Sequence, residues 1–274
     1  MRLLSSPFEP GALAPPCAPA RVYAQVGGVF AMIVAAGLAW EWAGVGPSAL
    51  GHALASGAVH AGLLALGWLL ATDAADGWRG PVLRLGTTLV LAALAARLHP
   101  LGALVFLLVP GLLVLEARRR PRIRAIGLGG AHPAHALAGL VIGTFLGAHL
   151  LVTASRTLGY RLHVGGLPAY LSALAYDVGA NAMSAEWLFR GAVFSLLWRR
   201  GTFWPAALLT TALSLVRYLL DPFLPHAAEA RAGAVFYLGL VGLIACALRA
   251  WSGSLLPGYL AALAFFAAYR MLAP

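Results

Sequence analysis

The chain has 274 residues, of which 61% are hydrophobic and only 10% are charged, and its mean hydropathy is +0.84. A water-soluble domain of this length could not bury so much apolar surface, so the composition excludes a soluble protein and predicts a polytopic membrane protein. The formal net charge of +10 comes from arginine alone, because the sequence contains no lysine.

The basic charge does not indicate a nucleic-acid partner. Basic domains often bind nucleic acid, but here the arginines stand at the ends of apolar runs, which is the pattern of topology signals in membrane proteins. The two cysteines, Cys17 and Cys246, are far apart and offer neither a disulfide framework nor metal-ligand spacing. We therefore expect no metal, no cofactor and no nucleic acid, and membrane lipid as the surrounding partner.

In chain order, the apolar runs predict an all-α bundle. Each run is near the roughly 20 residues that a helix needs to cross a bilayer. Asp177, Gly179 and Asn181 interrupt the long sixth run, so a count of eight spans with one half-inserted segment stays open beside the count of nine. The predicted spans are Val22–Val45, Ser48–Thr72, Pro81–Leu98, Leu101–Glu116, Pro133–Ala154, Pro168–Trp198, Phe203–Leu220, Ala232–Trp251 and Ser254–Leu272.

The second run carries two kinds of packing signal. Gly51, Ala55 and Ser56 have small-residue spacings that let neighbouring helices approach closely. His52 and His60 lie eight residues apart and do not share one tight face. We interpret these histidines as packed or interfacial, rather than as ligands.

The strongest charge run, Arg118–Arg124, divides the chain. It predicts three parts: an N-terminal tail (1–21), N-terminal transmembrane helices (22–124) and a C-terminal transmembrane core (125–274). Such a run can bind anionic lipid headgroups, but short Arg-rich loops more often mark the cytoplasmic side.

Alternating outward from that loop puts the N-terminus and Arg199–Arg200 in the cytoplasm, and the loop with Asp221 and Glu229 outside. The first twenty residues, rich in Pro and Ala, lack an apolar core and are not expected to be a signal peptide. Abundant Ala, Gly, Leu and Arg without Lys indicate a GC-rich, bacterial genome. The expected location is therefore the bacterial inner membrane.

Within the sixth run, Glu186 and Arg190 are the candidate functional residues. Their spacing of four puts both side chains on one helix face, with the acid N-terminal to the base, which favours an ion pair. A charged side chain near the bilayer centre costs about 2.5–3.5 kcal/mol on insertion scales. Such residues persist when they are paired, when they face the bundle interior, or when they are functional.

The segment Ser184-Ala-Glu-Trp-Leu-Phe-Arg-Gly191 resembles the Glu-Glu-x-x-x-Arg-Gly signature of the CAAX-protease and bacteriocin-processing (CPBP, or Abi) family of intramembrane proteases. The match keeps the second Glu and the Phe-Arg-Gly, whereas Ala185 replaces the first Glu. Two later segments, Phe236–Leu243 and Trp251–Gly258, resemble the last helix pair of that family and the turn that joins it. The resemblance spans about residues 135–270 and implies a CPBP-type helical bundle.

The resemblance also implies a site, most of which is substituted. In the family, the first Glu and two imidazoles activate a water for attack on an amide, and His and Asn stabilise the oxyanion. Leu213 and Arg217 replace the family's Phe and His in one motif. In the last motif, Ala262 and Phe266 replace His and Asn. Of the charged and polar residues of these motifs, Glu186 and Arg190 remain. A carboxylate paired with an arginine is a poor base, because the arginine keeps it ionised and occupies its oxygens.

Two other histidines could replace the missing imidazole. Phe145-Leu-Gly-Ala-His149 has the spacing of the family's Phe-x-x-x-His motif, but it lies upstream of the acid motif, and a packed histidine is the simpler interpretation. His226 falls in the predicted outer loop, too far from the membrane midplane.

Three functions therefore stay open. The first is an intramembrane endopeptidase that cuts a membrane-tethered protein or peptide, with Glu186 as its acid and an altered partner set. The second is a non-catalytic family member, a pseudoprotease that binds or chaperones such a segment. The third is an unrelated transporter-like protein, which should show internal repeats that this sequence lacks.

Overall fold

The computed structural model describes residues 19–44, 46–71, 78–118, 120, 124–157, 159–162, 166–220 and 228–273. The first eighteen residues with Cys17, most of the arginine run, and the loop with Asp221 and His226 lie outside the described residues. The described chain divides into two compact units, which we treat separately. The N-terminal unit contains Leu13–Ala125 and Gly166–Leu188, and the C-terminal unit contains Ile126–Gly165 and Phe189–Pro274. The three predicted parts of the chain stay a prediction.

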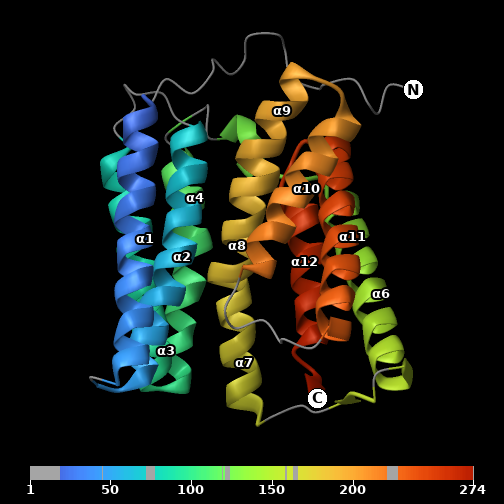
Figure 1. Cartoon of the computed structure of the whole chain (residues 1–274). Helices are drawn as coiled ribbons and strands as arrows, with labels where there is room; N and C mark the ends of the chain where they lie inside the picture. The colour runs from blue at the N-terminus through green and yellow to red at the C-terminus, as the bar shows by residue number, and fades with distance from the viewer. Residues whose placement is uncertain are drawn as a thin grey trace. The chain divides into compact units, whose positions relative to one another are not determined.

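In the N-terminal unit, long apolar helices lie side by side (Figure 1). They are α1 (Ala20–Ala43), α2 (Ser48–Ala71), α3 (Arg79–Leu98), the 3-10 helix η3 (Pro100–Leu107) and α4 (Leu108–Arg118). Gly44, with φ of 61°, ends α1 in the left-handed conformation that glycine adopts without strain. A Cβ on Gly51 would lie 2.5 Å from the carbonyl oxygen of Gly37, so α1 and α2 touch through their backbones. The predicted close approach at Gly51 and Ala55 is confirmed.

The C-terminal unit has a similar glycine seam. The kinked turn η4 (Arg124–Leu128) spans the division, and the unit contains α6 (Pro133–Thr157), α9 (Phe194–Arg200), α10 (Phe203–Leu219), α11 (Ala228–Ser252) and α12 (Leu256–Tyr269). Gly139, Gly143 and Gly147 recur every four residues on α6 and face α12. A Cβ on Gly139 would lie 2.1 Å from the carbonyl oxygen of Pro257. Only glycine permits this approach, and the sequence analysis did not single out the seam.

The predicted last span is too long at its C-terminal end. Helix α12 stops at Tyr269, and Leu272–Ala273 (β2) pairs with Arg161–Leu162 (β1) as a two-residue antiparallel ladder. The pairing satisfies backbone groups of the strand residues themselves. These short strands are a minor addition to a helical architecture.

The predicted sixth span is helical throughout but irregular. It runs through α7 (Leu167–Tyr176), the π-helical stretch η5 (Asp177–Asn181), α8 (Ala182–Ala185), the π-helical stretch η6 (Glu186–Val193) and α9. The predicted interruption at Asp177, Gly179 and Asn181 is thus a widening of the helix rather than a break. Gly179 has a packing role there, because a Cβ would lie 1.9 Å from the carbonyl oxygen of Phe106.

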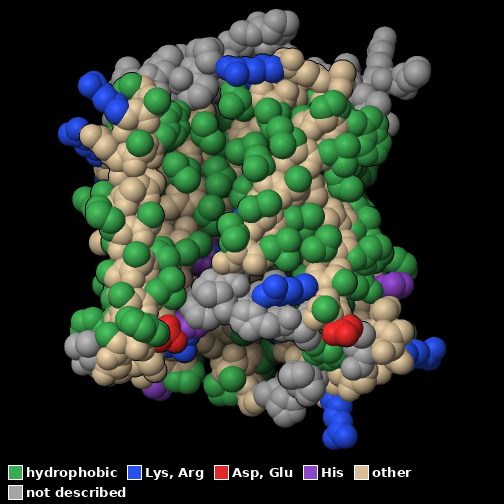
Figure 2. Space-filling model, viewed as in Figure 1, with side chains coloured by type: hydrophobic (Ala, Val, Ile, Leu, Met, Phe, Trp, Pro, Cys, Tyr) green, Lys and Arg blue, Asp and Glu red, His purple; other side chains and the backbone are tan. Residues whose placement is uncertain are grey.

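Helix lengths and side chains identify a multi-pass membrane protein. Among the described residues, six helices are long and apolar enough to cross a membrane, and two shorter apolar helices, Phe203–Leu219 and Leu256–Tyr269, accompany them. Figure 2 shows hydrophobic side chains over the visible face of the helices, with charged side chains mostly toward helix ends. The prediction of an all-α polytopic membrane protein is confirmed.

Candidate functional site

Glu186 and Arg190 both lie in η6, and their side chains are 4% and 3% exposed. Burial of this degree is what charged groups within an apolar segment require. The division between the two units falls between Leu188 and Phe189. Glu186 is therefore described with the N-terminal unit and Arg190 with the C-terminal unit. Their role as site residues, and the ion pair between them, stay predictions.

The Arg190 guanidinium lies beside hydroxyl side chains of α10, within the C-terminal unit. Its Nη1 donates a hydrogen bond of 3.0 Å to Ser214 Oγ on α10. Gly242 on α11 makes room for the guanidinium, since a Cβ there would lie 2.5 Å from Arg190 Nη2 and 2.9 Å from Thr211 Cγ2. Thr210, Thr211 and Ser214 form a buried polar face on α10. A guanidinium held in this way can recognise a carbonyl or carboxylate oxygen.

The residues at the positions expected for the other family motifs are packed against neighbouring side chains. Arg217 is half-buried, and its Cζ lies 4.3 Å from the centre of the Tyr218 ring. Ala262 and Phe266 on α12 are buried. The Phe266 ring centroid lies 6.3 Å from that of Tyr218 and 5.7 Å from that of Phe265. Aromatic packing therefore surrounds Phe266, which the resemblance places where the family has an amide.

His149 joins two helices of the C-terminal unit. Its Nδ1 is 2.8 Å from the hydroxyl oxygen of Tyr237, so the histidine connects α6 to α11. This is the contact expected of a packed interhelical histidine. A role for His149 beside Glu186 stays a prediction.

The sequence analysis missed a polar group around His60. Its Nδ1 lies 2.8 Å from Ser184 Oγ, and its Nε2 lies 2.7 Å from the hydroxyl oxygen of Tyr176. His60 is 2% exposed and Ser184 is fully buried. The prediction of a packed histidine is confirmed. However, no local pattern indicates these partners, because they lie 124 and 116 residues along the chain.

Residues on both sides of Glu186 contact α2. Ser184 contacts His60 on α2, and Trp187 Nε1 donates to the carbonyl oxygen of Leu64 on the same helix at 3.1 Å. A Cβ on Gly67 of α2 would also meet the indole of Trp187 and Leu188 Cα. The segment around Glu186 is therefore packed closely against α2 within the N-terminal unit.

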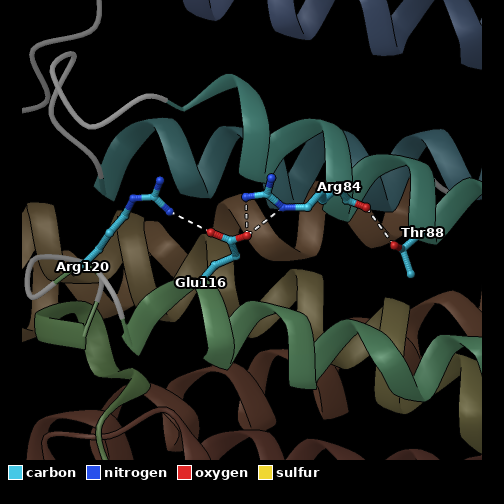
Figure 3. Close-up of polar contacts among 4 residues, drawn as sticks. All are labelled: Arg84, Thr88, Glu116 and Arg120. Carbon is cyan, nitrogen blue, oxygen red and sulfur yellow. Dashed lines mark hydrogen bonds and ion pairs between the residues drawn. The ribbon is translucent and has the colours of Figure 1, made fainter.

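A charged cluster in the N-terminal unit joins α3 to α4 (Figure 3). Glu116 Oε1 accepts from Arg84 Nε at 2.8 Å and also from Arg84 Nη2, and Glu116 Oε2 accepts from Arg120 Nη1 at 2.9 Å. The guanidinium of Arg120 lies 5.3 Å from the Trp68 ring. The cluster connects Arg120, in the arginine run, to α3. Within α3, the Thr88 hydroxyl donates a hydrogen bond to the backbone carbonyl oxygen of Arg84.

Among the described residues, no group of three or more His, Cys, Asp or Glu side chains could hold a metal ion.

Comparison with known proteins agrees with the signature. No curated protein and no solved structure matches the chain significantly. One family does match, over the segment that carries η6, α10, α11 and most of α12. Residues 168–266 match the family described as type II CAAX prenyl endopeptidase Rce1-like, so the predicted resemblance is confirmed for that segment.

Proposed function

We propose that the chain binds the terminal segment of a membrane-tethered protein or peptide without the family's glutamate-dependent hydrolysis. It does so in the bacterial inner membrane, with its N-terminus in the cytoplasm. The observation that carries this proposal is the aromatic packing of Phe266 against Phe265 and Tyr218, where the family places an oxyanion-stabilising amide.

The substitutions remove the side chains that would activate a water molecule, but they keep hydrogen-bond donors that could bind a peptide. Amide hydrolysis needs a base that takes a proton from the attacking water and an acid that gives one to the leaving amine. Removal of one oxyanion donor alone costs about 10²–10³ in rate. Ala262 and Phe266 supply neither function. Arg190, with Ser214 and Thr211 around it, keeps a donor set for a peptide oxygen.

Endopeptidase activity with Glu186 as the base is the second candidate. It is favoured by the burial of Glu186 inside a segment that matches the protease family. The same match disfavours an unrelated transporter.

Binding is tested with the full chain in nanodiscs and a fluorescent peptide that carries a lipid anchor. We expect saturable binding that the same peptide without its anchor does not reproduce. Arg190→Ala should weaken binding by about tenfold, equivalent to about 1.4 kcal/mol. The matched control is Arg156→Ala, an exposed arginine on α6. Equal binding of tethered and untethered peptide would contradict the proposal.

Orientation is tested separately, by labelling single cysteines placed in the Arg118–Arg124 loop and beside Arg199–Arg200. Short arginine-rich loops resist translocation, so both sites should react from the cytoplasmic side. Reaction of the two sites from opposite sides would rule out the proposed topology.

A further inference from the structure

One carboxylate holds two guanidinium groups at one end of the N-terminal unit. Glu116, near the end of α4, accepts hydrogen bonds from Arg84 Nε at 2.8 Å and from Arg120 Nη1 at 2.9 Å (Figure 3). Glu116 is buried, and it fixes Arg84 of α3 and Arg120 beside the end of α4. Because one carboxylate faces two arginines, the cluster carries a net charge of +1.

The sequence next to this cluster adds more positive charge. The stretches 72–84 and 116–124, which contain the start of α3 and the end of α4, hold seven arginines and three carboxylates. Asp73 and Asp76 therefore offset only part of the arginine charge. A polybasic stretch at the end of membrane helices attracts the anionic headgroups of the bilayer.

Arg84 keeps hydrogen-bond donors at the protein surface. Its side chain is 55% exposed, although both Nε and Nη2 donate to Glu116. A guanidinium has five N–H donors, so those that point away from the carboxylate can reach a second oxygen group. Glu116 already orients the planar guanidinium, so little side-chain entropy is lost when a phosphate binds.

An exposed apolar face continues from Arg84 along α3. Leu83 and Leu91 are both exposed, and their spacing of eight residues puts them on one side of the helix. Between them, the Thr87 hydroxyl donates to the carbonyl oxygen of Leu83 within the helix. Trp78 precedes α3, and tryptophan is typical of the membrane–water interface. A charged group at the helix end beside an apolar face matches a phospholipid, whereas a soluble phosphate would use only the charged part.

We propose that Arg84, Arg120 and the exposed face of α3 at Leu83 and Leu91 form a binding surface for an anionic phospholipid, in the leaflet that meets this end of the unit. Arg84 donates to the phosphate, Arg120 adds positive charge beside it, and an acyl chain lies along the two leucines. Each arginine near an anionic surface strengthens binding about fivefold. The surface belongs to the N-terminal unit and is separate from the proposed peptide binding at Arg190.

The test uses the full chain in phosphatidylcholine nanodiscs that contain a photoreactive phospholipid with a diazirine in one acyl chain. Phosphatidylglycerol and phosphatidylcholine probes with identical chains are compared, and crosslinked peptides are mapped by mass spectrometry. The phosphatidylglycerol probe should label residues 83–91 at least about fivefold more than the phosphatidylcholine probe. Arg84→Gln should lower that ratio about fivefold. The matched control is Arg97→Gln, an exposed arginine in the last turn of the same helix, which should leave the ratio unchanged.

Folding of each variant is checked by monodisperse elution in size-exclusion chromatography. If Arg84→Gln does not fold, the wild-type ratio decides, and equal labelling of residues 83–91 by both probes would overturn the proposal. An unchanged ratio in folded Arg84→Gln, or an equal fall in Arg97→Gln, would overturn it as well. Loss of the preference in excess soluble glycerol phosphate would assign the surface to a soluble phosphate instead. Binding of the tethered peptide is measured separately, so either proposal can fail alone.

Discussion

The glycine seam between α6 and α12 gives the sharpest test of the fold. A Cβ on Gly143 would lie 2.2 Å from the carbonyl oxygen of Ala261 and 2.6 Å from its Cα. Ordinary van der Waals contact begins at 3.4 Å, so the first distance is short by about 1.2 Å. The obstacle is backbone, which cannot rotate away as a side chain can. Gly143→Ala must therefore push the two helices apart.

The magnitude follows from two opposing effects. Overpacking of a close interface costs about 1–3 kcal/mol, and the upper part of that range applies because the clash is with backbone. Alanine regains about 1 kcal/mol through its better helix propensity. The net destabilisation is about 1–2 kcal/mol, which corresponds to a fall in melting temperature of about 2–8 °C for a chain of this size.

The assay is thermal unfolding in detergent, followed by the loss of the monodisperse peak in size-exclusion chromatography. Gly233→Ala on α11 is the matched control, because nothing lies within 4 Å of the Cβ it would add. It should be neutral or slightly stabilising. Equal melting temperatures for the two variants would refute the close contact between α6 and α12.

The remaining stability predictions concern the charged clusters. Glu116→Gln should lower the free energy of unfolding by about 1–3 kcal/mol, because two arginines lose their carboxylate; Glu229→Gln, at the exposed start of α11, should have no measurable effect. Gly242→Ala should displace the guanidinium of Arg190 and remove a charged hydrogen bond worth about 1.5–3 kcal/mol, whereas Gly239→Ala on the same helix meets its nearest atom at 3.7 Å and should be tolerated. Both pairs are compared by thermal unfolding, and equal melting temperatures within a pair would contradict the cluster concerned.

Hydrophobic runs predicted most of the helices because length and apolar content are the direct requirements of a membrane span. The run predicted at Ser48–Thr72 is α2 (Ser48–Ala71), and that predicted at Phe203–Leu220 is α10 (Phe203–Leu219). The π-helical stretches on either side of Ser184 were not predicted, since they depend on tertiary packing such as Gly179 against Phe106.

The sequence predicted the candidate residues of one segment, but not the distant residues that contact them. Glu186 and Arg190 stood out because charge within an apolar run is costly. The contact of Arg190 with Ser214 and the pairing of His60 with Ser184 join residues 24 and 124 positions apart, and no periodicity encodes them. The sequence showed only that these polar residues lie inside apolar runs. That observation does not indicate which residues they contact.

The most direct test of the proposed function is a comparison of the wild-type chain with Glu186→Gln in proteoliposomes. Both are incubated with a library of lipid-anchored peptides, and the products are measured by mass spectrometry. Wild-type protein should yield no cleavage product above the level found with Glu186→Gln, because Ala262 and Phe266 stand where the resemblance implies the family's imidazole and amide. A peptide product that forms with the wild type and disappears with folded Glu186→Gln would contradict the account and establish an endopeptidase.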